Sequence, residues 1–95
     1  MTKQEENQMQ FIGTCLLTQQ VPKIDLKLFD NTMDQKIYKA MDQLGDKRWP
    51  IDIISISENI GPGASERCME CLRVTPTSAN MGLIMAIMDV LRGAM

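Results

Sequence analysis

Apolar residues along most of the chain recur every three or four positions, which is the spacing of an amphipathic helix. Near the N-terminus this pattern predicts a helix over about residues 4–19. Thr2 and Glu5 have the spacing of a capping box at its start, in which each side chain satisfies a free backbone amide. Pro22 interrupts the pattern, and residues 24–28 can then form one short turn or helix.

The pattern resumes over residues 32–44 and predicts a second helix. Asn31 or Thr32 can cap its first turn, and Gly45 is a suitable residue to end it. Just beyond, Trp49 is a single aromatic residue beside a loop. We expect it to lie as a lid over the core of this helix, with a platform for stacking as the alternative.

Residues 51–60 are rich in isoleucine, which favours a strand on propensity alone. An isolated strand is not stable, however, and the chain offers no second strand. Asp52 can cap a helix here, and its apolar face would contain Ile53, Ile56 and Ile60. We therefore predict a helix, followed by a short helix that Ser65 can cap and that ends near Leu72.

The last stretch, from Thr75 to Met95, predicts the most apolar helix of the chain. We expect Pro76 in its first turn, with Thr75 or Thr77 as the cap. One stripe of the helix suffices to dock it on a core: Met81, Ile84, Ile87, Met88, Leu91 and Met95. The remaining apolar and small residues give the helix more apolar surface than one small subunit can cover. We predict that they form an interface with another chain: Gly82, Leu83, Ala86, Val90, Gly93 and Ala94.

Together these elements predict one all-α domain over residues 1–95, a compact bundle of five or six short helices. The core should be aliphatic and rich in methionine, which serves both as helix filler and as an adaptable binding surface. The net charge is −2, and no run of basic residues exceeds the pair Lys47-Arg48, so direct binding to nucleic acid is not expected. The polar N-terminus is not a signal peptide, and the C-terminal apolar run is too short to span a bilayer, so we expect a cytoplasmic protein.

No pattern of residues indicates catalysis, a cofactor or a metal. The chain has no histidine and none of the glycine-rich loops that bind nucleotides. Cys68 and Cys71 form a C-x-x-C motif, but only Cys15 remains to complete a zinc site that normally needs four ligands. We interpret the three cysteines as free thiols that pack as small apolar residues, and a shared zinc site between two subunits is the alternative. Several aspartates are expected to cap helices or to lie on solvated faces: Asp25, Asp30, Asp34, Asp42 and Asp46.

Several segments, taken in order, resemble the N-terminal domain of the DnaB-type bacterial replicative helicases. The first is Phe11 to Leu17 (FIGTCLL), which is similar to the first helix of that family. The others are Phe29 followed by Ile37-Tyr38 and Ala40-Met41, then Pro50-Ile51-Asp52, and finally the sequence TPTSAN over 75–80. The resemblance covers about residues 5–92.

The resemblance implies an all-helical domain without catalytic function, because the ATPase motor of that family lies in a separate domain. It also implies self-association, and contact with primase or helicase-loading proteins. The matched positions carry structural roles only: Leu16, Phe29, Ile37, Tyr38 and Met41 in the core, Pro50 and Asp52 at one helix start, and Pro76 and Asn80 at another. Gly82 and Gly93 depart from the pattern and weaken the last helix by about 1 kcal/mol each, unless close packing offsets this.

Three functions remain open at this point. The chain can be the interaction domain of a replicative helicase, as a fragment or as a short protein built on that domain alone. It can instead be a free-standing phage or mobile-element regulator that mimics the domain in order to load or inhibit a host helicase. The third interpretation is a small thiol or zinc protein that uses Cys15, Cys68 and Cys71.

Overall fold

Five α-helices and one 3-10 turn make up the regular structure of the computed structural model, which describes residues 2–93. Their bounds are α1 Lys3–Thr18, η1 Leu26–Leu28, α2 Thr32–Asp46, α3 Ile53–Ile60, α4 Ala64–Arg73 and α5 Met81–Gly93. No strand occurs among these residues, so the predicted all-α class and the helix over 51–60 are confirmed. No helix in the described chain is both long and apolar enough to cross a membrane.

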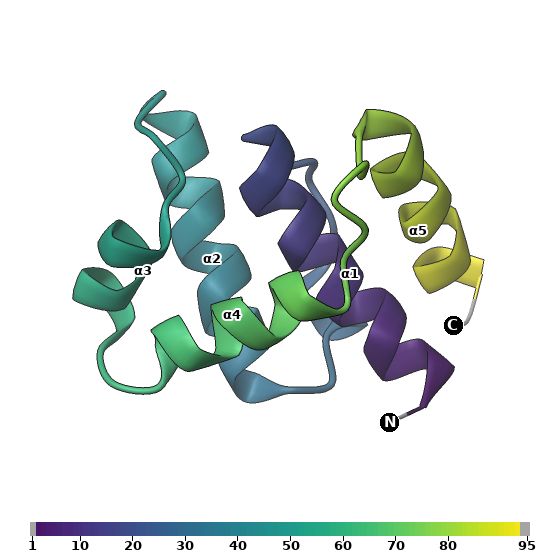
Figure 1. Ribbon diagram of the computed structural model, residues 1–95, viewed down its shortest axis with the longest axis horizontal. Coiled ribbons are helices and arrows are strands. Elements are labelled where there is room, and N and C mark those ends of the chain that lie inside the picture. The colour runs from purple at the N-terminus through teal and green to yellow at the C-terminus, as the bar shows by residue number, and fades with distance from the viewer. Residues whose placement is uncertain (1, 94–95) are drawn as a thin grey trace.

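The longest helix, α1, lies at the centre of the molecule. It packs against α5 on one side and against α2 on the other, while α4 crosses it near its middle (Figure 1). The short helix α3 lies at the far edge, where it contacts α2 and α4. The terminal helix α5 therefore has one principal neighbour, α1.

Three aromatic rings form the centre of the core between α1 and α2. Phe11, Phe29 and Tyr38 lie with their ring centroids 5.4 to 6.0 Å apart, in tilted and edge-to-face arrangements. Ile37 and Met41 are fully buried beside them, as predicted. Leu16 was expected in the core as well, but it is only partly buried and packs against the core from its edge.

Side chains cap four of the five helices, three of them at predicted residues. At four positions a side-chain oxygen accepts a hydrogen bond from the backbone N–H three residues on, over 2.8 to 3.1 Å: Thr2, Asn31, Asp52 and Asn80. Such caps satisfy amides that have no partner within the helix. Pro50, which the resemblance placed with Asp52 at a helix start, lies exposed in the loop before α3.

The end of α2 differs from the prediction. Gly45 does not end this helix, which continues through Asp46. The chain reverses at Arg48, whose φ of 58° is left-handed. The N–H of Arg48 donates to the carbonyl of Gly45, and the N–H of Trp49 donates to that of Leu44, so the last carbonyls are satisfied by a Schellman motif.

Two predicted helix starts are also wrong. Ser65 lies inside α4, because Gly63 in the left-handed region occupies the cap position. Pro76 lies in a turn, where its carbonyl accepts a hydrogen bond from the N–H of Ala79, and α5 begins only at Met81. The cap of α5 is Asn80, and the hydroxyl of Thr75 donates instead to the carbonyl of Cys71 in α4.

Candidate functional site

The sequence predicted an interface with another chain on helix α5, on the side that does not contact the core. Four side chains of this helix are buried against α1 and the core: Ile84, Ile87, Met88 and Leu91. They occupy one stripe of the helix, as predicted, although Met81 at its start is exposed. Met95 lies outside the described residues.

The predicted interface residues lie mostly on the side of α5 that faces away from α1. Gly82, Ala86, Val90 and Gly93 are exposed, with Val90 at 53 %. At about 100° per residue these four share an arc of roughly 80°. Leu83 lies at the edge of this arc and is partly buried against the core, whereas Ala94 is outside the described residues. We call Gly82, Ala86, Val90 and Gly93 the outer face of α5.

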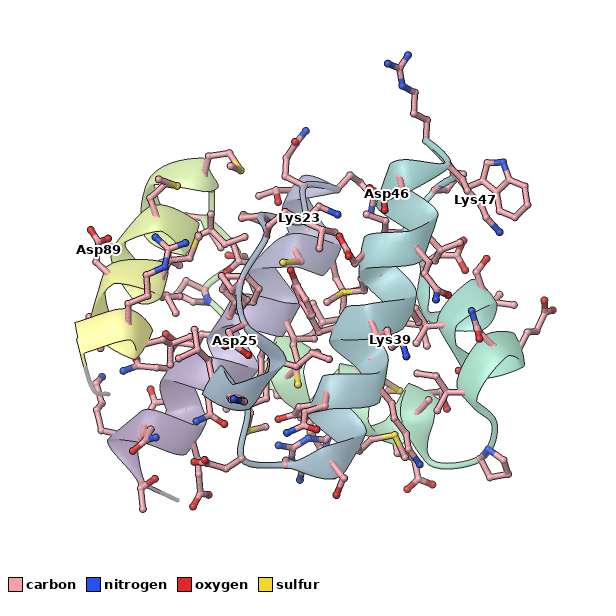
Figure 2. All side chains as sticks on the ribbon, turned by 180° about the vertical axis from the view of Figure 1, so that it is seen from behind. Lys23, Asp25, Lys39, Asp46, Lys47 and Asp89 are labelled. Atoms are coloured by element: carbon pink, nitrogen blue, oxygen red, sulfur yellow. The ribbon has the colours of Figure 1, made fainter. Side chains whose placement is uncertain are left out.

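Charged and larger apolar side chains border the outer face of α5. Asp89 points away from the molecule at its outer edge (Figure 2). On the flank beyond it, Met85 is 51 % exposed. The helix therefore presents apolar surface on both sides of Asp89: the outer face with Val90 on one side, and Met85 on the other.

A second apolar surface, which the sequence analysis did not predict, is a groove of about 410 Å³ between three helices. It lies where the end of α1, the start of α3 and the end of α4 meet, and apolar side chains form most of its lining: Leu16, Leu17, Ile51, Ile53, Ile54 and Leu72. Ile54 is the most exposed of the large apolar residues, at 71 %. The signal in the sequence was Ile54, which lies about 100° around the helix from Ile53 and so falls outside the face predicted to contain Ile53, Ile56 and Ile60.

The three cysteines are buried and free, as the sequence predicted. Burial raises the pKa of the Cys68 thiol to about 11 and raises the pKa of Cys15 and of Cys71 further, because a thiolate is poorly solvated there. Cys68 and Cys71 face the core from α4 as small apolar residues. Among residues 2–93 no three His, Cys, Asp or Glu side chains lie together in a way that could hold a metal ion.

Two residues have surroundings that differ from those predicted. Asp34 was expected as a cap or on a solvated face, but its carboxylate is buried and bound by Arg67. Trp49 was expected as a lid over the core, but it is 59 % exposed. The reversal after α2 turns it outward, where the Lys47 ammonium lies 4.8 Å from the ring centroid in a cation–π contact.

Both apolar surfaces leave large aliphatic side chains in contact with water. Comparisons of the chain with models of protein families, with curated proteins and with solved structures found no match. The residues of this chain must therefore support a functional assignment by themselves.

Proposed function

We propose that this chain is a non-catalytic protein–protein interaction domain that self-associates through the outer face of α5. The observation that carries the proposal is the position of this helix at the edge of the fold. It packs mainly on α1, and its other side presents Val90 with small residues around it. Burial of such a face in a second subunit would be favourable by about 25 cal/mol for each Å² of apolar surface removed from water.

The small residues favour another helix as the occupant. An added Cβ at Gly93 would meet no heavy atom within 4 Å, and Ala86 carries only a methyl group, so a second backbone can approach this side closely. A two-fold arrangement brings the same face of both subunits together, and it places each Val90 against the partner's helix. Asp89 and Arg92 then lie at the rim, where charged side chains are usually found.

We further propose that the domain acts in DNA replication in the cytoplasm, in the manner of the helicase N-terminal domains that it resembles, with primase or a helicase loader as partner. Support comes from the order of the similar segments and from the burial of Phe29, Ile37, Tyr38 and Met41 at matched positions. The caps formed by Asp52 and Asn80 fall at matched positions as well. The three free thiols agree with a reducing compartment.

Light scattering coupled to size-exclusion chromatography tests the self-association. The protein should elute as a dimer or larger at high micromolar concentration, and Val90→Glu should release a folded monomer because it would bury a charge in the interface. Ile54→Glu is the matched control, since Ile54 is also an exposed aliphatic residue but lies on α3. A monomeric wild type, or the same loss of association in both variants, would refute the interface on α5.

A pull-down with primase and replicative helicase from the same source tests the replication partner. Retention of either protein by the wild type supports the proposal. The Ile54→Glu and Val90→Glu variants then show whether the partner occupies the groove or the outer face of α5. Retention of neither protein would contradict the replication role and leave the self-association to be judged by light scattering alone.

A further inference from the structure

A line of basic side chains follows one exposed face of α2. Lys36, Lys39, Gln43 and Lys47 are spaced by three or four residues, so they lie above one another along the helix. Figure 2 shows Lys39 on α2 and Lys47 just beyond the end of this helix. Within residues 2–93 none of these lysines pairs with a carboxylate, in contrast to Lys23, which contacts Asp42 and Asp46.

These side chains line two adjoining hollows between α2 and α3, which we call the basic path. Lys36, Lys39, Gln43 and Asn59 line its first part, together with Ala40 and Ile60. The second part is lined by Gln43, Lys47, Trp49 and Asn59, with Leu44, Ser55 and Glu58. Because both parts share Gln43 and Asn59, they adjoin each other, and together they extend from α2 to the reversal that follows it.

Trp49 lines the second part of this path and also the hollow that follows it. A third hollow continues from it, lined by Gln20, Arg48 and Trp49 together with Gln19, Gly45, Pro50 and Ile51. Lys47 does not line this third hollow, so its cation–π contact leaves the indole open on that side. Arg48 adds a fourth cation there, again without a carboxylate partner in the described part of the chain.

We propose that this path binds single-stranded nucleic acid, with phosphates along Lys36, Lys39, Lys47 and Arg48 and a base stacked on Trp49. Cations that follow a groove, combined with an exposed aromatic ring, are the two features on which binding of single strands depends. The amides of Gln20, Gln43 and Asn59 add donors and acceptors for base edges.

Two observations favour an unpaired strand over other polyanions. The cations form a line along one helix and do not spread over a broad face, and a base inside a duplex cannot stack on Trp49 without leaving the helix. Glu58 lines the second part beside Lys47 and opposes any anion there, so the preference for a strand over an acidic peptide rests on the indole. The exposed indole gives no advantage to an acidic peptide, which lacks a planar group to cover it.

The chain has a single tryptophan, so its intrinsic fluorescence reports on this site directly. Titration of the full chain with an oligothymidylate of about twelve nucleotides at low salt should quench the emission as a base stacks on the ring. With four phosphates neutralised, a plot of log affinity against log salt should have a slope of about −3. The affinity should then fall about 50-fold between 50 and 200 mM salt.

Matched variants separate stacking from charge. Trp49→Ala should weaken binding by about tenfold, whereas Trp49→Phe should retain most of it; fluorescence anisotropy of a labelled oligonucleotide measures both. Lys36→Gln combined with Lys39→Gln should reduce the salt slope by about 1.4, and Lys3→Gln combined with Arg73→Gln should leave it unchanged. No quenching at low salt, equal loss in the two charge variants, or equal binding of polyglutamate would overturn the proposal, the last in favour of an acidic protein partner.

Discussion

Arg67 holds the buried carboxylate of Asp34 with two hydrogen bonds, Nε to Oδ1 at 2.7 Å and Nη2 to Oδ2 at 2.8 Å. Asp34 is 1 % exposed, so its carboxylate depends on this contact for its charge compensation. The pair joins the first turn of α2 to the middle of α4, and it holds the pKa of the Arg67 guanidinium above its usual value. Glu70 contacts the same guanidinium from the surface at 3.3 Å.

Removal of the guanidinium should destabilise the fold strongly. Arg67→Ala leaves the Asp34 carboxylate buried without a partner, and we expect a loss of about 3 kcal/mol in the free energy of unfolding, measured with urea. Glu70→Ala removes only the surface partner and should cost less than about 1 kcal/mol. A similar loss in both variants would mean that the carboxylate of Asp34 finds compensation elsewhere.

The general plan of this fold can be read from local signals. Asn31 and Asp52 each precede an apolar stripe by the distance that a cap requires, and these local rules act on neighbouring residues only. The buried stripe of α5 followed from helical spacing in the same way. The starts of α2 and α3 and the buried stripe of α5 were therefore predicted correctly, whereas the starts of α4 and α5 were not.

Three features of the structure were not predicted, each for a different physical reason. Asp34 is buried because Arg67, which is 33 positions away, meets it, and no local pattern announces that contact. Trp49 is exposed because a Schellman motif places Arg48 in a conformation that glycine usually adopts. The lysines along α2 were not predicted as a binding surface because they are several residues apart and form no contiguous basic run.

The cysteines predict how stability depends on alkaline pH. Burial holds the pKa of Cys68 at about 11 in the native state, above the ordinary value of 9.0, so the unfolded chain releases this proton first. The stabilisation is fully present below about pH 9 and is lost as the pH rises towards 11; Cys15 and Cys71 act in the same direction. The urea midpoint should fall over that range.

A Cys68→Ala variant is the control for this pH effect, because its midpoint should fall less steeply between pH 9 and 11. In the native protein the three thiols should also react with Ellman's reagent only as fast as the chain unfolds, since both burial and protonation protect them. Rapid reaction of any of them in the absence of denaturant would contradict this environment.

The hydroxyl of Tyr38 fixes the segment between α1 and η1. It donates a hydrogen bond to the carbonyl of Pro22 at 2.7 Å and accepts one from the N–H of Ile24 at 3.0 Å. Tyr38→Phe keeps the aromatic packing but leaves both backbone groups unpaired, so we expect a loss of about 1–3 kcal/mol. Amide hydrogen exchange at Ile24 should accelerate, and unchanged exchange there would show that water replaces the hydroxyl.

Gly13 and Gly93 should respond in opposite directions to the same substitution. A Cβ on Gly13 would lie 1.9 Å from Oγ1 of Thr75 and 2.9 Å from the carbonyl oxygen of Cys71, so α4 and the turn after it would have to move away from α1. Thr75 would also lose its hydrogen bond to that carbonyl, which measures 2.6 Å. Gly13→Ala should therefore cost about 1–3 kcal/mol despite the better helix propensity of alanine. Gly93→Ala meets no atom within 4 Å and should stabilise the subunit by up to about 1 kcal/mol.

Both glycine substitutions are best measured by urea unfolding in the Val90→Glu background, where association would not add to the stability of the subunit. In the wild-type background Gly93→Ala should instead weaken the dimer, because its methyl group would occupy the space that the partner helix uses. A dimer that is unaffected by Gly93→Ala would place the contact on the flank of α5 that carries Met85, and a neutral Gly13→Ala would mean that α4 can shift from α1 at little cost.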